Sequence, residues 1–174
     1  MKRVAVVTTA SGCGGTTCGR ALAERLGVPY VELDALFWKP GWVESTSEEL
    51  RAAVEPIVAT DAWVIDGGYW GRLGDVVVKR SELVVWLDLD IATWLPRLLR
   101  RTLRRIVRRE VLWNGNRETF RGAFLGRDAL IPYMLRNYRR RRRVYPERLS
   151  SHDHVRLRSQ VEIDAFVRSV ASET

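Results

Sequence analysis

The chain has 174 residues, of which 46% are hydrophobic and 29% charged, and its formal net charge is +8. This length is typical of one domain with a substantial core, so we expect a single domain over residues 1–174. No apolar stretch reaches the roughly 18 residues that span a bilayer, and no secretion signal follows the first residues, so we expect no membrane association. Two cysteines fit a reduced cytoplasm, and we predict a cytoplasmic location.

Strands and helices alternate along the chain without a linker or a repeat. The second predicted helix begins with the capping sequence Thr46-Ser47-Glu48-Glu49, and the first ends at Gly27, a typical C-terminal glycine. Strands are predicted at 4–7, 29–33, 62–65, 83–87 and 155–157, and helices at 16–26, 46–59, 93–109, 128–145 and from 161 onward. This order predicts a doubly wound α/β fold, in which helices cover both faces of a five-stranded parallel sheet and the first strand is central.

The turn after the first strand matches a phosphate-binding loop without its lysine. A strand, a glycine-rich turn and a helix are the context of the sequence G-x-x-x-x-G-K-[ST]. Here Gly14-Gly15-Thr16 stands where that pattern has Gly-Lys-Thr, and Thr9 replaces the leading glycine. The amides and the hydroxyl are retained, which favours anion binding. The expected phosphate ligands are Gly12, Cys13, Gly14, Gly15, Thr16 and Thr17.

Thr16 would also provide a hydroxyl ligand to Mg²⁺, unless it is a plain N-terminal helix residue. Two further strands end in Asp34 and in Asp66-Gly67-Gly68. Open parallel sheets bind ligands at the carboxyl ends of their strands, so these residues and the loop are predicted to form one crevice. Asp34 is the candidate general base for an acceptor hydroxyl, with helix capping as the alternative. Gly67 and Gly68 permit close approach of a ligand to the backbone.

Five segments of the chain are distinctive in combination: V-V-T-T-A-S-G-C-G-G-T-T, V-E-L-D-A-L-F-W-K-P-G-W, W-V-I-D-G-G-Y, V-V-W-L-D-L and V-L-W-N-G-N-R-E. In this order they resemble the adenylate-kinase-like P-loop proteins of the FlaR (topology modulation protein) family. The resemblance implies a nucleoside-monophosphate-kinase-like fold with an arginine-bearing lid at approximately 105–127. It also implies phosphoryl transfer from ATP, with Mg²⁺, to a small-molecule acceptor. Asp66 resembles the aspartate of a D-G-[FY] segment that holds the metal through water.

Arginine supplies most of the positive charge, with 26 of the 29 basic residues. Such a surface suits nucleic acid or a site for several phosphates. In the helix predicted at 93–109, Arg104 and Arg108 share a face with Arg100, and we expect them to reach a phosphate from the lid. The run 139–143 is expected to be a solvated helix face.

Other side chains are candidates for binding the acceptor. Trp38, Trp42 and Tyr69 are predicted to lie beside the acceptor and could stack on a planar substrate. Arg127 and Arg136 resemble the arginines that follow the lid in adenylate kinases.

The loop departs from the family at four positions between Gly12 and Gly19, where the family reads G-S-G-K-[ST]-T-L-A. Loss of the lysine removes about 2–4 kcal/mol of phosphate interaction, or roughly two to three decades in rate. Three alternatives therefore stay open: a kinase that uses arginines, a site repurposed for another transfer such as sulfuryl transfer, and a silent nucleotide- or anion-binding protein. A basic nucleic-acid-binding regulator is disfavoured, because Asp34, Asp66 and the loop converge.

Overall fold

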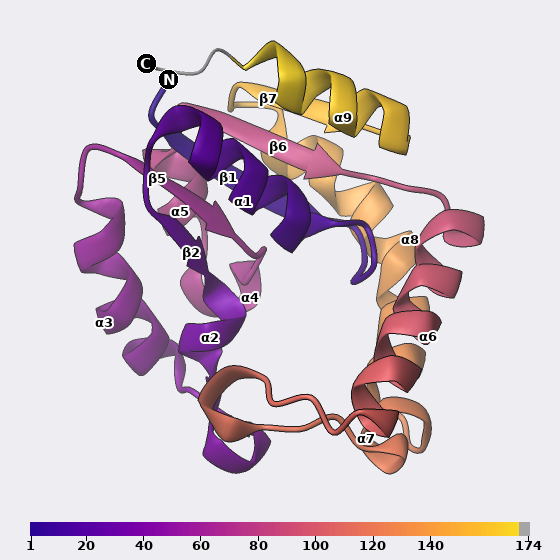
Figure 1. The fold of residues 1–174 in the computed structure, drawn as a ribbon. Coiled ribbons are helices and arrows are strands. Elements are labelled where there is room, and N and C mark those ends of the chain that lie inside the picture. The colour runs from indigo at the N-terminus through magenta and orange to yellow at the C-terminus, as the bar shows by residue number, and fades with distance from the viewer. Residues whose placement is uncertain (171–174) are drawn as a thin grey trace.

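The computed structural model describes residues 1–170 and contains a five-stranded parallel sheet (Figure 1). The strand order is β2-β5-β1-β6-β7, and every neighbouring pair is parallel. The strands are β1 (Arg3–Thr8), β2 (Tyr30–Glu32), β5 (Trp63–Asp66), β6 (Leu83–Leu87) and β7 (His154–Leu157). The sequence prediction of a doubly wound α/β fold with the first strand at the centre is confirmed.

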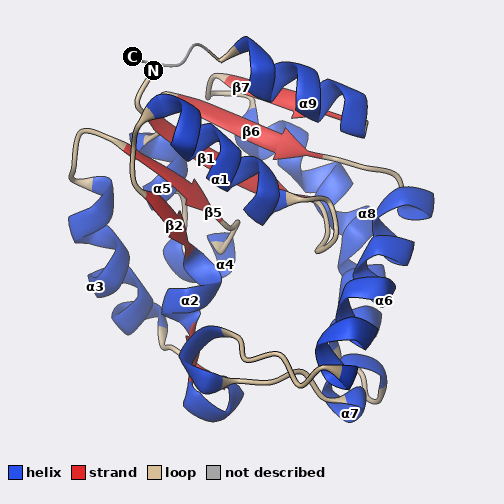
Figure 2. Ribbon diagram, viewed as in Figure 1, coloured by secondary structure: helices blue, strands red, loops and turns tan. Residues whose placement is uncertain are grey.

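Helices cover both faces of this sheet (Figure 2). The main helices are α1 (Gly15–Leu26), α3 (Ser47–Val58), α5 (Val76–Arg80), α6 (Ile91–Val107), α8 (Leu130–Leu149) and α9 (Gln160–Ser169). Side chains of β1 alternate between two cores, as the period of a strand requires. Val4 and Val6 pack with α1, α6 and α9, whereas Ala5 and Val7 pack with α3 and α5. The central strand is therefore buried on both sides, and this holds the loop that follows it in a fixed place.

The predicted helix ends are confirmed where local chemistry specifies them. Thr46 and Glu49 form both hydrogen bonds of the capping box at the start of α3. Gly27 ends α1 in a left-handed conformation with φ 63°. α8 continues to Leu149, beyond the predicted end at Tyr145. None of the helices in residues 1–170 combines the length and the apolar character that crossing a bilayer would require.

Several short elements were not predicted, and they lie around the carboxyl edge of the sheet. They are α2 (Leu33–Phe37), β3 (Trp38–Lys39), the 3-10 turn η1 (Pro40–Trp42), β4 (Val43–Glu44) and α4 (Trp70–Leu73). β3 and β4 pair as a small antiparallel hairpin outside the main sheet. Within the region predicted as a lid at approximately 105–127, the segment that follows α6 contains the 3-10 turn η2 (Trp113–Gly115) and α7 (Phe120–Phe124).

Candidate functional site

A cavity of about 1840 Å³ lies at the carboxyl ends of β1, β2 and β5. The phosphate loop forms one wall, and α2 with the β3–β4 hairpin forms the opposite wall. Helices α6 and α8 contribute arginines, and the segment between α6 and α7 closes the space. The predicted site residues that line it are Gly12, Cys13, Gly14, Gly15, Thr16, Thr17, Asp34, Trp38, Trp42, Asp66, Gly67, Gly68 and Tyr69.

The loop has the geometry of an anion site. Gly12 and Gly14 have φ values of +97° and +93°, which side chains with a Cβ rarely adopt. The amide of Cys18 makes the first bond of α1, to the carbonyl of Gly14 at 2.9 Å. The N–H groups of residues 15–17 precede that bond and have no carbonyl to reach within the helix. They are therefore free to receive a phosphate at the positive end of the helix dipole.

The lysine position of the loop is filled by a carboxylate. A Cβ on Gly15 would lie 2.6 Å from Asp66 Oδ1 and 2.9 Å from Thr8 Cγ2. Glycine thus lets the Asp66 carboxyl approach the backbone at the start of α1. Any larger residue here requires Asp66 to move.

Asp66 belongs to a small cluster of oxygen atoms at the start of α1. The Thr16 hydroxyl lies 3.0 Å from Glu32 Oε1 and 3.3 Å from Asp66 Oδ2, to which the Tyr30 hydroxyl also donates at 3.3 Å. Burial, followed by the charges of Asp34 and Glu32, raises the pKa of Asp66 to about 7. Within residues 1–170, neither Asp66 nor Glu32 forms an ion pair with a basic side chain.

These oxygen donors suit Mg²⁺, which prefers carboxylates, hydroxyls, waters and phosphates. No group of three or more His, Cys, Asp or Glu side chains in the described part of the chain could hold a metal by itself. A Mg²⁺ ion would therefore rely on Thr16 and Asp66 together with oxygens of a bound phosphate. The residues fit a metal that arrives with its nucleotide.

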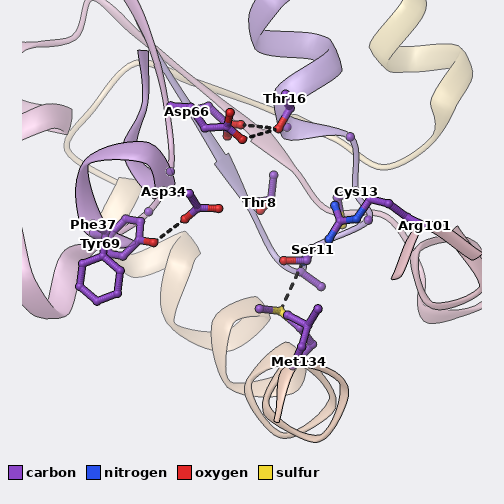
Figure 3. A pocket seen from close by; sticks show the side chains of 18 of the residues that line it. Thr8, Ser11, Cys13, Thr16, Asp34, Phe37, Asp66, Tyr69, Arg101 and Met134 are labelled. Carbon is purple, nitrogen blue, oxygen red and sulfur yellow. Dashed lines mark hydrogen bonds between the residues drawn. The ribbon is translucent and has the colours of Figure 1, made fainter. Parts of the chain in front are cut away.

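Asp34 faces the loop from the other wall of the cavity (Figure 3). The predicted strand at 29–33 is shorter, because β2 ends at Glu32 and Asp34 lies in the first turn of α2. The Tyr69 hydroxyl donates a hydrogen bond to Asp34 Oδ1. Burial raises the pKa of Asp34, while this hydrogen bond and the charges of Arg101 and Arg105 oppose the rise. One carboxyl oxygen is thus held, and the other remains available to the cavity.

The arginines of α6 that reach the cavity are Arg97, Arg101 and Arg105. In Figure 3, the Arg101 side chain extends from α6 toward the loop. No side chain in residues 1–170 pairs with it, and its Nε is buried without a hydrogen-bond partner. Burial, followed by the charge of Arg105, lowers its pKa. Arg105, one turn further along, binds Glu118 Oε1 at 2.9 Å.

The two arginines of α6 that the sequence predicts to reach a phosphate lie away from the cavity. Arg104 is exposed and pairs with Glu110 at 3.0 Å, and Arg108 is exposed at the end of the helix. Neither lines the cavity. The physical reason is the position of the buried stripe, which includes Leu98 and Thr102 and brings the adjacent row of arginines toward the loop.

Arg127 and Arg136 also lie outside the cavity. Arg136 donates to the carbonyl of Arg127 at 2.7 Å and pairs with Asp128 at 3.3 Å. The Arg136 side chain therefore contacts the turn before α8, to which Arg127 contributes only its carbonyl. An exposed surface pair of this kind contributes little to stability.

The chain is similar to known kinases in part of its sequence and in its fold. No family model matches the chain. The chain is 35% identical over 105 residues to a shikimate kinase of Gloeobacter violaceus, and 34% over 103 residues to one of Sulfurihydrogenibium sp.. Each alignment covers 50% of this chain, and the chain spans only 56% and 61% of the lengths of these relatives. The shikimate kinase of Acinetobacter baumannii, solved with shikimate, aligns with 98% of this chain and 91% of its own at 19% identity and a TM-score of 0.61.

The chain has a P-loop kinase fold. Two of its relatives of modest identity are shikimate kinases.

Part of the run 139–143 is engaged inside this fold, contrary to the expectation of a solvated face. Arg141 lines the cavity and donates to the carbonyl of Thr9 at 3.3 Å. Arg142 pairs with Asp88 at 3.0 Å. α8 runs across the end of the sheet, so its inner arginines meet the loop and the end of β6 rather than water.

Asp88 is a buried residue that the sequence analysis did not single out. It is fully buried after β6, and it binds both Arg142 and Arg156, the latter at 2.5 Å. It also accepts a hydrogen bond from the Thr9 hydroxyl at 2.8 Å, and that hydroxyl accepts one from Trp86 Nε1 at 2.8 Å. Its place directly after an apolar strand, like that of Asp66, is the signal that could have found it.

Cys13 lies in the loop but is unsuited to reactivity. Its side chain is fully buried, and burial raises the pKa of its thiol. A lowered pKa, which its position at a helix N-terminus suggests, is therefore not found. Cys13 contributes packing and a backbone amide to the loop.

Proposed function

We propose that the protein transfers a phosphoryl group from a nucleoside triphosphate, with Mg²⁺, to a hydroxyl group of a small acceptor. One observation carries the proposal: the anion-binding loop and the Asp34 carboxyl face each other across a single cavity, into which the Arg101 guanidinium extends without an ion-pair partner in residues 1–170. This arrangement supplies positions for a donor, an acceptor and the charge that develops between them.

The donor side consists of the loop and the oxygen cluster beside it. The amides of Gly12 and of residues 14–17 would hold the phosphates, whereas the amide of Cys13 donates within the loop to the carbonyl of Ala10 at 3.2 Å. Thr16 with Asp66 would hold the metal. When bound, Mg²⁺ neutralises phosphate charge and orients the donor. Burial raises the pKa of Asp66 to about 7, and a bound metal would favour its ionised form.

The acceptor side is centred on Asp34. Its Oδ1 is held by Tyr69, so Oδ2 can accept the proton of an acceptor hydroxyl. As that proton leaves, the acceptor oxygen bonds to the γ-phosphorus, and the bond from phosphorus to the leaving diphosphate oxygen breaks. Burial raises the pKa of Asp34, which makes it a better base than an exposed aspartate. Trp38 and Trp42 would form the wall against the acceptor body.

Arg101 takes the role that a loop lysine would have. Phosphoryl transfer depends mainly on positioning and on neutralising charge at the transferred group. A guanidinium on a well-packed helix is fixed in advance for this task. The FlaR-like segments quoted above support phosphoryl transfer to a small acceptor, and the two free cysteines fit action in the cytoplasm.

A second function is favoured by one specific observation. The Asp66 carboxylate lies where a lysine side chain would begin, which places negative charge near the phosphates. A nucleotide- or anion-binding protein without turnover, or a sulfuryl transferase, would tolerate this better than a fast kinase. The internal contacts of Arg141 and Arg142 argue against a nucleic-acid surface on that helix.

The proposal is tested by binding and transfer measured on the same preparation. Calorimetry with Mg²⁺ and a non-hydrolysable ATP analogue measures donor binding. ATP with a labelled γ-phosphate, incubated with a panel of small hydroxyl acids, sugars and nucleosides, measures transfer, with Asp34→Asn as the control. Labelled product that depends on Asp34 supports the proposal. Donor binding without transfer to any acceptor would favour the silent binding protein, and absence of donor binding would contradict both.

A further inference from the structure

The two most distinctive segments of the sequence contact each other in the structure. Residues 113–118, here called the strap, carry the sequence W-N-G-N-R-E and lie between α6 and α7. They lie against residues 35–42, which include the end of α2 and the β3–η1 turn (Figure 1). The proposed chemistry uses Asp34, Trp38 and Trp42 of the first segment but gives the strap no role of its own, whereas the contact between the two segments does.

Two asparagines of the strap make this contact. Asn116 is buried; its Nδ2 donates to the carbonyl of Lys39 at 2.9 Å, and its Oδ1 accepts from the amide of Trp42 at 2.9 Å. Asn114 donates through Nδ2 to the carbonyls of Trp38 at 2.6 Å and Ala35 at 3.1 Å. Both amide side chains thus bind backbone groups of residues 35–42 directly and tie the strap to that segment.

Unusual backbone dihedral angles on both sides of the contact also favour this arrangement of the strap. Asn114 has φ 55° and Trp42 has φ 59°, values that residues other than glycine seldom adopt. The Trp42 indole donates to the carbonyl of Arg117 at 2.9 Å, and its ring packs edge-to-face on Trp38 and Trp113. The strain in each segment is compensated by contacts with the other.

The other end of the strap is anchored to the opposite wall of the cavity. Glu118 is nearly buried and binds Arg105 of α6 at 2.9 Å. The strap therefore connects the arginine side of the site to the side that carries Asp34, and it closes the space between them.

The contact with the strap affects α2, which has only five residues. A helix of this length is not stable by itself, so its ends must be satisfied by other parts of the chain. Ala35, whose carbonyl binds Asn114, is the neighbour of Asp34. Holding this carbonyl holds the turn from which Asp34 projects.

We propose that Asn114 and Asn116 are positioning residues: by locking the strap onto residues 35–42, they hold Asp34 toward the phosphate loop and close the cavity over the acceptor. The proposal rests on the proposed function for its catalytic consequence, but the contact and its effect on Asp34 can be measured without turnover. Release of the strap would open the cavity for entry and exit of the acceptor.

Two variants and one matched control test the strap. Asn114→Gly removes the amide but tolerates φ 55°, so it adds no backbone strain. Asn116→Asp keeps the acceptor for Trp42 and loses the donor to Lys39. Arg117→Ala lies in the same strap; its side chain is exposed, lies outside the cavity and makes no hydrogen bond or ion pair in residues 1–170. Thermal unfolding of each variant first confirms that it is folded.

The first readouts need no substrate. We expect the near-ultraviolet circular dichroism of the tryptophan cluster to weaken in both asparagine variants and to stay unchanged in Arg117→Ala. Carbon NMR of the Asp34 carboxyl should show its titration moving toward that of an exposed aspartate in the asparagine variants only. A purely structural role remote from Asp34 would leave that titration in place. Unchanged titration and dichroism in both folded variants would overturn the proposal.

The second readout is kinetic and separates the two proposals. We expect kcat to fall about tenfold to a hundredfold and the KM for the acceptor to rise, with the donor Kd unchanged, because displacement of a base by about 1 Å costs roughly this much. Equal kcat and KM in Asn114→Gly and wild type would overturn the catalytic part of the strap proposal. Absence of transfer by the wild type would contradict the proposed function, while NMR and dichroism would still decide the contact.

Discussion

Asp66 Oδ1 lies 2.6 Å from the point that a Cβ on Gly15 would occupy. The glycine at the lysine position is therefore part of a packed arrangement and not an empty place in the loop. The Asp66 carboxylate packs against the start of α1, so a longer side chain at position 15 would have to displace it. The chemistry of the loop consequently depends on two strands, β1 before it and β5 beside it.

Gly15→Lys is expected to tighten binding of ATP with Mg²⁺ about tenfold, because one charge-assisted contact contributes about 1.5–3 kcal/mol and displacement of Asp66 takes part of this. Gly15→Met is the matched control, since it imposes the same Cβ contact without a charge. Calorimetry with both variants measures the difference. Equal affinity of Gly15→Lys and wild type would show that the loop does not hold a triphosphate.

Asp34→Asn is expected to reduce turnover by about 10²–10⁴ with little change in donor affinity, because the amide keeps the shape of the carboxyl but cannot accept the proton. Steady-state kinetics gives the turnover and calorimetry gives the donor Kd. An Asp34→Asn protein with wild-type turnover would remove Asp34 from the mechanism.

Arg101→Gln is expected to lower kcat by roughly 10²–10³, the usual cost of removing one preorganised group that stabilises transition-state charge. Arg104→Gln, three residues along the same helix but outside the cavity, should leave kcat unchanged. Both variants are measured with the acceptor that gives transfer in the wild type. A larger loss of kcat in Arg104→Gln than in Arg101→Gln would support the sequence prediction that Arg104 acts on the phosphates.

The unusual pKa of Asp66 predicts a pH-dependent stability. The fold raises this pKa from 3.8 to about 7, so it favours the protonated form. The contribution of the protonated Asp66 carboxyl to the free energy of unfolding is fully present below pH 3.8 and is lost as the pH rises through about 7. Asp66→Asn, which stays neutral, should therefore have a higher Tm than wild type at pH 8, with a gap that narrows toward pH 4.

Thermal unfolding across this pH range measures the gap, and about 1 kcal/mol corresponds to a shift in Tm of roughly 2–4 °C at this chain length. Added Mg²⁺ should reduce the gap at pH 8 if the ion binds the carboxylate. A gap that is constant from pH 4 to 8 would show that Asp66 does not carry the titration.

The sequence predicts the sheet because its signals are local. Apolar runs, the capping box at Thr46 and the glycine at position 27 act within a few residues, and parallel strands bring their ends together by topology. The convergence of the loop, Asp34 and Asp66 follows from this geometry. The segment 33–44 was not predicted because its two-residue strands and five-residue helix depend on partners more than seventy residues away, such as Asn116.

The arginines show a second limit of sequence reasoning. Helical spacing correctly groups residues four apart, but it does not say which group faces the loop. That choice depends on the packing of Leu98 and Thr102, which is a tertiary property. For the same reason Arg141, in a run that looks solvated, contacts the first residue of the loop.

Thr9 restricts which residues can occupy the first position of the loop. Glycine at this position, as in the usual phosphate-loop pattern, would leave the Trp86 N–H without its acceptor and Asp88 without one of its donors, both inside the core. The unpaired Trp86 N–H costs about 1–3 kcal/mol, whereas Asp88 keeps Arg142 and Arg156 as partners. A change of Thr9 to glycine alone would therefore destabilise the fold, because Trp86 in the neighbouring strand β6 would lose its hydrogen-bond acceptor. Among relatives, glycine at position 9 should therefore accompany a residue other than tryptophan at position 86, and the two positions should vary as a pair.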